Sequence, residues 1–200
     1  MKIICIGRNY ANHAKELGNQ LPKEPVIFMK PESALSFSDT FSIPTFSNNI
    51  HHELEVVVKI NKKGRHISKE KASDFYDELA LGIDFTARDI QTILKNKGLP
   101  WEKAKSFDQS AFLSRFFSKE AFTNQTFFSL KKNNQLVQEG QTQNMLFSIN
   151  ELIEHCSTYF TLEPEDLIYT GTPEGVGQII KGDILEGFIE NTSFFKVKIT

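Results

Sequence analysis

Two acidic residues stand at the head of an apolar run, at a spacing that suits cation binding. Glu53 and Glu55 precede the run at residues 56–60, which is rich in valine. Side chains alternate faces along a β-strand with a rise of about 3.3 Å per residue, so both carboxylates face one side with Cα atoms about 6.6 Å apart. They are therefore close enough to bind one ion. A solvated strand face is the ordinary alternative for an isolated Glu-x-Glu pair.

A third acid, Asp84, lies in the apolar sequence Leu-Gly-Ile-Asp-Phe at residues 81–85. Burying a carboxylate in such a run is costly unless it is paired or binds a metal. Three carboxylates without a cysteine cluster favour a hard cation such as Mg²⁺ or Mn²⁺. His51 shares the predicted face of the two glutamates, so a site with two carboxylates and one histidine is the alternative. That alternative leaves Asp84 without a role.

A histidine and a glutamate three residues apart indicate a possible acid–base pair. His13 and Glu16 fall in a predicted helix over residues 11–17, with Gly18 and Asn19 as its end. Residues at this spacing share a helix face. A carboxylate beside an imidazole fixes its tautomer and raises its basicity, as a general base requires. A surface ion pair is the alternative.

A predicted helix over residues 86–95 carries two groups that bind carboxylates. Arg88 and Gln91 are three residues apart on it, and a carboxylate ligand near Asp84 would lie within reach of both. Lys105 follows in a predicted loop, where a lysine is usually solvated unless its surroundings give it a role.

A glycine-rich loop follows a predicted strand over residues 167–170. Gly171, Gly175 and Gly177 surround Thr172 and Pro173. Such a loop allows backbone amides to approach an anion closely, although a purely structural turn is equally consistent. It is not a P-loop, because the terminal Lys-Ser/Thr is missing.

The remaining elements must position these groups, and the second half of the chain is predicted to be mainly β. Ser148 is a predicted N-cap, His155 a capping or packing residue, and Lys30 lies in an expected turn. Further strands are expected over residues 2–6, 26–29, 52–60 and 79–85, hairpins over 127–138 and 184–199, and helices over 68–77 and 148–155.

Composition limits the class of protein. The 200 residues suit one domain, and 23 basic against 25 acidic residues give a net charge of −2 without a basic block, which argues against nucleic-acid or anionic-membrane partners. Neither a signal peptide nor a membrane-spanning stretch is evident. Two cysteines imply no disulfide framework and fit a cytoplasmic setting, and the 18 phenylalanines are assigned to the core and a subunit interface.

Six short blocks of the sequence, in their order along the chain, resemble the fumarylacetoacetate hydrolase family. The resemblance is to its short, single-domain members similar to acylpyruvate hydrolase and oxaloacetate decarboxylase. The resemblance extends over nearly the whole chain. The blocks are Gly-Arg-Asn-Tyr-Ala-x-His at 7–13, His-His-Glu-Leu-Glu at 51–55, Asp-Phe-Thr-Ala-Arg-Asp at 84–89, Gly-Leu-Pro-Trp at 98–101, Ala-Lys-Ser-Phe at 104–107 and Thr-Gly-Thr-Pro-x-Gly-Val-Gly at 170–177.

The resemblance implies an α+β, strand-rich fold with a mixed, rolled β-sheet and a few short helices, forming a homodimer. It implies Mg²⁺ or Mn²⁺ held by Glu53, Glu55 and Asp84. His13, Glu16 and Lys105 match the family's catalytic residues, the first two on a segment that closes over ligand in relatives. Arg8, Arg88, Gln91 and Thr172 match positions that bind the substrate.

The activity implied by the resemblance is hydrolase or lyase chemistry on a small 2-keto acid of acylpyruvate or oxaloacetate type, with C–C cleavage releasing pyruvate through an enolate. The alternative is an isomerase or decarboxylase of the 2-hydroxyhepta-2,4-diene-1,7-dioate type from aromatic catabolism. A non-catalytic protein that binds metal and keto acid is the third possibility, but it needs neither the His13–Glu16 pair nor Lys105. The natural keto acid and the metal are not determined by the sequence.

Overall fold

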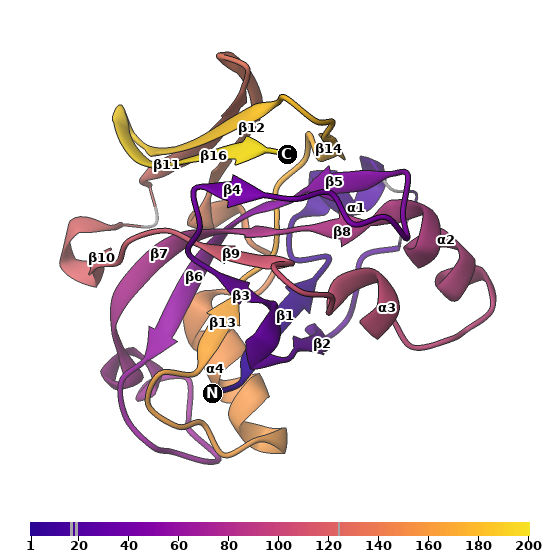
Figure 1. Cartoon of the computed structure of the whole chain (residues 1–200). Helices are drawn as coiled ribbons and strands as arrows, with labels where there is room; N and C mark the ends of the chain where they lie inside the picture. Colours follow the sequence, from indigo (N-terminus) through magenta and orange to yellow (C-terminus); the bar gives the residue numbers. More distant parts are fainter. Residues whose placement is uncertain (17, 19, 124) are drawn as a thin grey trace.

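The structure is a computed structural model that describes residues 1–16, 18, 20–123 and 125–200 (Figure 1). Within this part of the chain, short helices surround three β-sheets, as the strand-rich α+β prediction requires. No helix in the described residues is both long and apolar enough to cross a lipid bilayer.

The largest sheet has eight strands and carries most of the site. Its centre is β6, a strand buried almost throughout, which pairs antiparallel with β13 and β7, whereas β1 and β13 run parallel. The order is β2 (Val26–Lys30), β1 (Ile3–Gly7), β13 (Leu167–Tyr169), β6 (Leu54–Ile60), β7 (Tyr76–Asp84), β9 (Ala111–Leu113) and β3 (Leu35–Ser36), with β10 (Phe117–Ser118) against β7.

Two smaller sheets complete the β-structure. In Figure 1 the five-stranded sheet lies above the large one. Its order is β12 (Gln135–Gln141), β11 (Phe127–Lys132), β15 (Ile184–Ile189), β16 (Thr192–Ile199) and β4 (Thr40–Phe41); the three-stranded sheet has the order β14 (Gly177–Gln178), β5 (Ile50–His52) and β8 (Thr86–Ala87).

Four α-helices and four 3₁₀ turns are described between the strands. Ser148 caps α4 as predicted, because its side chain accepts the Glu151 amide while the Glu151 carboxylate accepts the Ser148 amide. The elements are α1 (Ala11–Glu16), α2 (Arg88–Asn96), α3 (Glu102–Lys105) and α4 (Ile149–Tyr159), with η1 (Glu32–Ala34), η2 (Ala72–Phe75), η3 (Lys119–Ala121) and η4 (Thr142–Asn144).

Aromatic side chains join the five-stranded sheet to the large one. Phe41 of β4 stacks on Phe85 with ring centroids 3.8 Å apart, and Phe112 of β9 meets Phe195 of β16 at 4.8 Å. All four rings are buried, in agreement with their predicted place in the core. Cys5 and Cys156 are buried and free, so the absence of a disulfide between them is confirmed.

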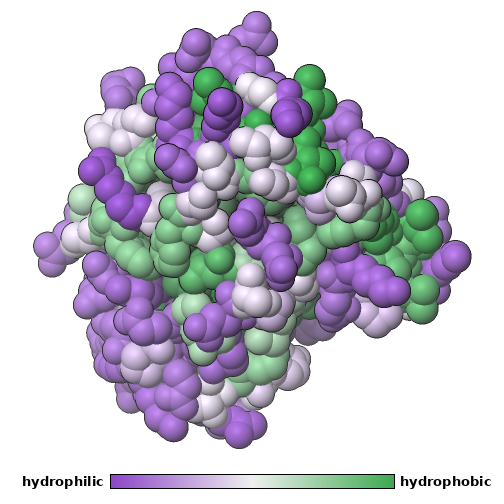
Figure 2. Space-filling model, in the orientation of Figure 1, coloured by the Kyte–Doolittle hydropathy of each residue, from purple (hydrophilic) through white to green (hydrophobic). Residues whose placement is uncertain are grey.

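The outer surface is mixed in polarity. Figure 2 shows hydrophilic side chains over much of one face, with apolar atoms at the right-hand edge over the segment of α2 and α3. The large apolar side chains exposed in that segment are Ile93 and Leu99.

The helix predicted over residues 68–77 is wrong. Only the single turn η2 forms there, and β7 begins at Tyr76, which pairs with Ile60 of β6. Tyr76 and Asp77, the last two residues of the predicted helix, lie in the strand instead. Pairing with the central strand outweighs the helical propensity of the preceding charged residues.

Three other predicted boundaries change. The helix expected from residue 86 starts at Arg88, because Thr86 and Ala87 pair with β5. Lys105 belongs to the one-turn helix α3 and not to a loop. His155 lies inside α4, packing against Tyr159, because the helix continues to Tyr159. Of the end predicted for the first helix, Leu17 and Asn19 lie outside the described residues.

Candidate active site

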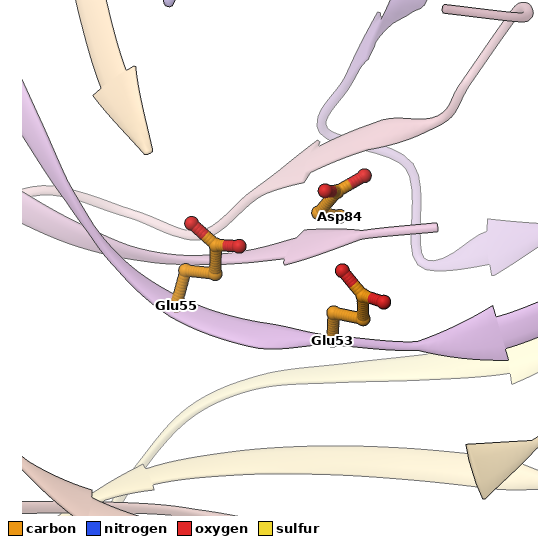
Figure 3. Close-up of side chains that lie close together, drawn as sticks. All are labelled: Glu53, Glu55 and Asp84. Atoms are coloured by element: carbon orange, nitrogen blue, oxygen red, sulfur yellow. The ribbon is translucent and has the colours of Figure 1, made fainter. Parts of the chain in front are cut away.

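Three carboxylates converge where two central strands lie side by side (Figure 3). Glu53 lies between β5 and β6, Glu55 is on β6, and Asp84 ends β7. The strand register places Glu55 opposite Gly82, and the Asp84 amide donates to the Glu53 carbonyl at 2.9 Å. One oxygen from each carboxylate lies within 4.8 Å of the others, and all three residues are at most 4% exposed. The predicted convergence of these side chains is therefore present.

Lys105 lies among these acids. Its Nζ donates to Glu53 Oε2 at 2.7 Å, to Asp84 Oδ2 at 2.6 Å and to Thr86 Oγ1 at 2.6 Å, which uses all three ammonium protons. Burial lowers the pKa of Lys105, but the charges of Asp84 and Glu53 outweigh it and raise the pKa above the usual value. Lys105 therefore carries a positive charge here.

A second buried lysine, Lys30, was missed by the sequence prediction, which placed it in a turn. It is the last residue of β2, and its Nζ lies 2.8 Å from Asp84 Oδ1 and 3.0 Å from both Ser110 oxygens. It also donates to the Lys105 carbonyl. The sequence did contain a signal for this burial. A lysine directly follows the apolar residues 26–29, and it becomes buried if the predicted strand continues by one residue.

Arg88 and Gln91 lie on the face of α2 toward the carboxylates, as predicted. Arg88 forms an ion pair with Glu53 through Nη2 and donates to Gln91 Oε1 through Nη1. Gln91 is 7% exposed. The guanidinium therefore joins the buried amide to the acidic cluster.

The two glutamates have opposite electrostatic surroundings. Burial opposes ionisation of Glu53, but Lys105 and Arg88 lower its pKa well below the usual range. Burial and the negative charge of Asp84 raise the pKa of Glu55 well above its usual value, against the hydrogen bond from Gly171. A divalent cation here would reverse the effect on Glu55, and three carboxylates match the oxygen ligands of Mg²⁺ and Mn²⁺. The donor set therefore fits such an ion.

The glycine-rich loop directs a backbone amide at the carboxyl group of the protein's own Glu55. The Gly171 N–H donates to Glu55 Oε2 at 2.7 Å. Gly171 has φ +101°, and a Cβ at this position would lie 2.7 Å from the Asn9 Cβ. Glycine is therefore required for this approach.

His13 and Glu16 form the predicted pair on α1. His13 Nδ1 lies 3.2 Å from Glu16 Oε2, and the His13 side chain is 7% exposed. Glu16 also accepts the Gly175 N–H at 3.2 Å. Glu16 thus orients the imidazole while joining α1 to the glycine-rich loop.

Thr172 is held by Gln138, a buried residue of β12 that the sequence prediction missed. Gln138 Nε2 donates to Thr172 Oγ1 at 2.8 Å and to the Pro173 carbonyl at 3.0 Å. Its Oε1 accepts the Leu54 amide at 3.0 Å and lies 2.9 Å from His52 Nδ1. Gln138 thus connects the glycine-rich loop to the start of β6. No signal in the alternating strand pattern distinguished it from a solvent-facing glutamine.

One cavity of about 460 Å³, its open mouth included, unites the predicted residues. Nine of the ten predicted site residues line it; the tenth, Glu16, acts on it through His13. Lys95 and Trp101 also line it, although the sequence prediction did not name them as site residues.

His51, the alternative metal ligand, is not part of the carboxylate group found in the described residues. Its Nε2 lies 3.0 Å from Asn49 Oδ1. The alternation that would align it with Glu53 and Glu55 fails because β5 ends at His52 and β6 begins at Leu54. Burial and the charge of Arg88 lower the pKa of His51 to about 4.

Comparison with known proteins identifies relatives along nearly the whole chain. The sequence profile described as fumarylacetoacetate (FAA) hydrolase C-terminal matches residues 2–200. The chain is 42% identical over 200 residues to oxaloacetate tautomerase FAHD1, mitochondrial, of Bos taurus, covering 98% of this chain and 90% of the relative. It is 42% identical over 189 residues to the mitochondrial oxaloacetate decarboxylase of Dictyostelium discoideum, covering 92% and 87% of the two chains.

The fold also matches a solved enzyme. The crystal structure of fumarylpyruvate hydrolase from Pseudomonas aeruginosa, in complex with Mn²⁺ and pyruvate, superposes with a TM-score of 0.93 at 32% identity. The match covers 100% of this chain and 89% of that one. The rolled, strand-rich architecture predicted from the sequence is therefore confirmed.

Proposed function

Because the chain belongs to the fumarylacetoacetate hydrolase family, we propose that it is a metal-dependent enzyme acting on a 2-keto acid of oxaloacetate or acylpyruvate type through an enolate. The observation that carries the proposal is the buried group of Glu53, Glu55 and Asp84, which shares one cavity with Lys105 and His13. A non-catalytic binding protein would need neither a buried lysine nor an oriented imidazole there.

Glu53, Glu55 and Asp84 are the residues that would hold the metal, either Mg²⁺ or Mn²⁺. Mn²⁺ is the ion bound in the fumarylpyruvate hydrolase of similar fold. When bound, the ion supplies Lewis-acid stabilisation of the negative charge that develops on the 2-keto oxygen. The pKa of Glu55, raised by burial and by Asp84, then falls, so all three acids act as carboxylates.

The chain's own cations and donors bind the keto-acid end. Arg88 and Gln91 face the carboxylates from α2 and are placed to donate to a substrate carboxylate. Lys105 adds a positive charge beside the developing enolate, and the Thr172 hydroxyl adds a further polar contact. These groups are preorganised because they are already hydrogen-bonded within the protein.

His13, oriented by Glu16, is assigned the proton transfers. With an acylpyruvate it removes a proton from the water that attacks the distal carbonyl, the C–C bond breaks, and pyruvate enolate and a carboxylic acid are released. With oxaloacetate, loss of CO₂ gives the same enolate and needs no attacking water. The two reactions therefore differ in their need for His13.

A second candidate is keto–enol tautomerisation of oxaloacetate, in which no C–C bond breaks. The His13–Glu16 pair favours it because such a pair can remove a proton from one atom and return it to another. The bovine relative that is 42% identical bears the name of this activity. The isomerase alternative, the homodimer and the cytoplasmic location remain predictions.

Pyruvate release from acetylpyruvate and from oxaloacetate by the purified protein tests the proposal. Each reaction is run with Mg²⁺, with Mn²⁺ and with EDTA, and corrected for protein-free decay. The absorbance of the enol of oxaloacetate, followed in parallel, detects tautomerisation without pyruvate. Metal-dependent turnover in at least one of these assays is expected, and none above background in all of them would refute the proposal.

A further inference from the structure

The side-chain amide of Gln138 is buried with a partner at every position where it can form a hydrogen bond. Gln138 lies on β12 and is 2% exposed. Its Oε1 accepts the Leu54 amide at 3.0 Å and lies 2.9 Å from His52 Nδ1. Its Nε2 donates to Thr172 Oγ1 at 2.8 Å and to the Pro173 carbonyl at 3.0 Å. These contacts use both lone pairs of the amide oxygen and both protons of the nitrogen.

Two backbone partners fix the orientation of this amide. A backbone N–H can only donate, so the atom of Gln138 beside the Leu54 amide is its oxygen. A backbone carbonyl can only accept, so the atom beside the Pro173 carbonyl is the nitrogen. The same nitrogen therefore donates to the Thr172 hydroxyl, and the hydroxyl cannot donate to it. A hydroxyl that accepts one hydrogen bond in this way still has its own proton to donate.

The Thr172 proton has a poor acceptor within the protein. Among the residues that the structure describes, the hydroxyl donates only to the Pro173 carbonyl, at 3.4 Å, which is long for a hydrogen bond between two oxygens. That carbonyl already accepts the Gln138 nitrogen. Thr172 is 4% exposed and lines the cavity that contains the three carboxylates. A short hydrogen bond from this hydroxyl is therefore available only toward the cavity.

The loop that carries Thr172 packs directly against the strand that carries Gln138. A Cβ on Gly175 would clash with the Val137 carbonyl, and a Cβ on Gly140 would lie 3.1 Å from Pro173 Cγ. These close approaches leave little room for the loop to shift relative to β12. The contact between Gln138 and Thr172 is therefore already in place before a ligand binds.

We infer that Gln138 is a positioning residue that makes the Thr172 hydroxyl a dedicated donor toward the ligand. This inference rests on the proposed function, in which Thr172 contacts the keto-acid end of the substrate. Gln138 donates to the hydroxyl oxygen and occupies the Pro173 carbonyl, so the hydroxyl proton is directed at a ligand atom. That atom must be an acceptor, as the carboxylate and enolate oxygens of a 2-keto acid are. Without Gln138 the hydroxyl rotates freely and can turn to the Pro173 carbonyl.

Coupling between positions 138 and 172 in ligand binding tests the inference. The probe is oxalate, a stable dianion whose four oxygens all accept hydrogen bonds, titrated calorimetrically with Mg²⁺ present. Thr172→Val should weaken oxalate binding roughly tenfold or more, because it removes a hydrogen bond to a charged group. Gln138→Met should weaken binding roughly fivefold when Thr172 is present, and by less than about twofold in the Thr172→Val background. Gln135→Met, which changes an exposed glutamine of the same strand, should have no effect in either background.

Gln138→Glu is the second variant, since Gln138→Met leaves the Leu54 amide unpaired and is at risk of misfolding. The glutamate keeps an acceptor for that amide, but the atom beside Thr172 becomes an oxygen to which the hydroxyl donates. Oxalate binding should fall at least as far as in Gln138→Met. The added negative charge repels oxalate in both backgrounds, so the measured quantity is the extra loss seen only when Thr172 is present.

The comparison between the two backgrounds decides the role of Gln138. Equal losses with and without the Thr172 hydroxyl would show that Gln138 acts only through the fold, and they would overturn the inference. Undetectable binding of oxalate by the unmodified protein would overturn it as well. Coupling without turnover of any keto acid leaves the positioning role standing while the proposed chemistry fails. Turnover of a keto acid without coupling refutes the positioning role alone.

Discussion

Asp84 lies directly across from Glu53 on the neighbouring segment, and one ammonium group bridges their carboxylates. The Asp84 amide donates to the Glu53 carbonyl at 2.9 Å, while Lys105 Nζ lies 2.7 Å from the Glu53 carboxylate and 2.6 Å from that of Asp84. The backbone ladder of the central sheet therefore sets the separation of these acids. Such a frame holds charged side chains more rigidly than a loop.

Glu55→Gln should stabilise the metal-free protein while weakening metal binding. The substitution removes a buried carboxyl group whose ionisation beside Asp84 is costly, and it keeps an oxygen that can accept the Gly171 amide. We expect unfolding free energy to rise by about 1 kcal/mol. Changing even an indirect partner of a metal ligand weakens binding about 10- to 100-fold, so losing a ligand should weaken Mg²⁺ binding by at least about a hundredfold.

Urea unfolding without metal and Mg²⁺ titration calorimetry measure the two effects in Glu55→Gln. Glu163→Gln, in an exposed ion pair with Lys63, is the control for loss of one glutamate charge. A variant that binds Mg²⁺ as tightly as the unmodified protein would remove Glu55 from the ligand set.

Lys30→Met should destabilise the fold strongly. The substitution leaves Asp84 without one of its two buried cationic partners, which costs about 3–5 kcal/mol. The double variant Lys30→Met/Asp84→Asn should lose less than the sum of the two single variants, because the residues interact directly. Urea unfolding of all three gives the interaction energy. Lys63→Met, which breaks a surface pair, should stay within about 1 kcal/mol. Additivity of the two buried substitutions would contradict a direct Lys30–Asp84 interaction.

His13→Gln should separate the two C–C cleavage reactions. Activation of water requires a base, so acylpyruvate hydrolysis should fall by about 10²–10⁴-fold, whereas oxaloacetate decarboxylation should fall much less. The measurement is kcat for both substrates with the same preparation, and His155→Gln in α4 is the matched control. An equal loss for both substrates would mean that His13 serves a step common to them.

Acidification should destabilise the protein through His51 between pH 6.5 and about 4. Burial and the charge of Arg88 lower the folded-state pKa of His51 from 6.5 to about 4. In this window the unfolded chain binds a proton that the folded protein does not, so stability is full above pH 6.5 and falls as the pH falls. His51→Gln should flatten this dependence in urea unfolding between pH 6.5 and 5. Identical slopes in variant and unmodified protein would show that another group is responsible.

The parts of the fold and site that were predictable have strong local patterns. Glu53, Glu55 and Asp84 stood out because acids next to long apolar runs are costly to bury without a partner. Ser148 and Glu151 form a capping box that is visible in the sequence. These features depend on a few neighbouring residues, so no long-range pairing had to be known.

The parts that were missed depend on tertiary contacts. Lys30 is buried because β2 pairs with β1 and places its last residue beneath Asp84. Gln138 is buried because β12 packs its side chain against residues near 53 and 172, far away in the sequence. Residues 68–77 have a helical pattern, but Tyr76 is taken up by pairing with Ile60. The pattern of residues within each segment does not identify the strand with which the segment pairs.

Exchange of the methyl protons of pyruvate for deuterium in D₂O tests the central claim most directly. Hydrolysis and decarboxylation share an enolate of pyruvate, so an enzyme that stabilises it should catalyse this exchange with Mg²⁺ bound, as followed by proton NMR. We predict exchange well above the protein-free rate that stops on addition of EDTA and is abolished in Glu53→Gln. Exchange that persists with EDTA, or no exchange above the protein-free rate, would contradict metal-dependent enolate chemistry at this site.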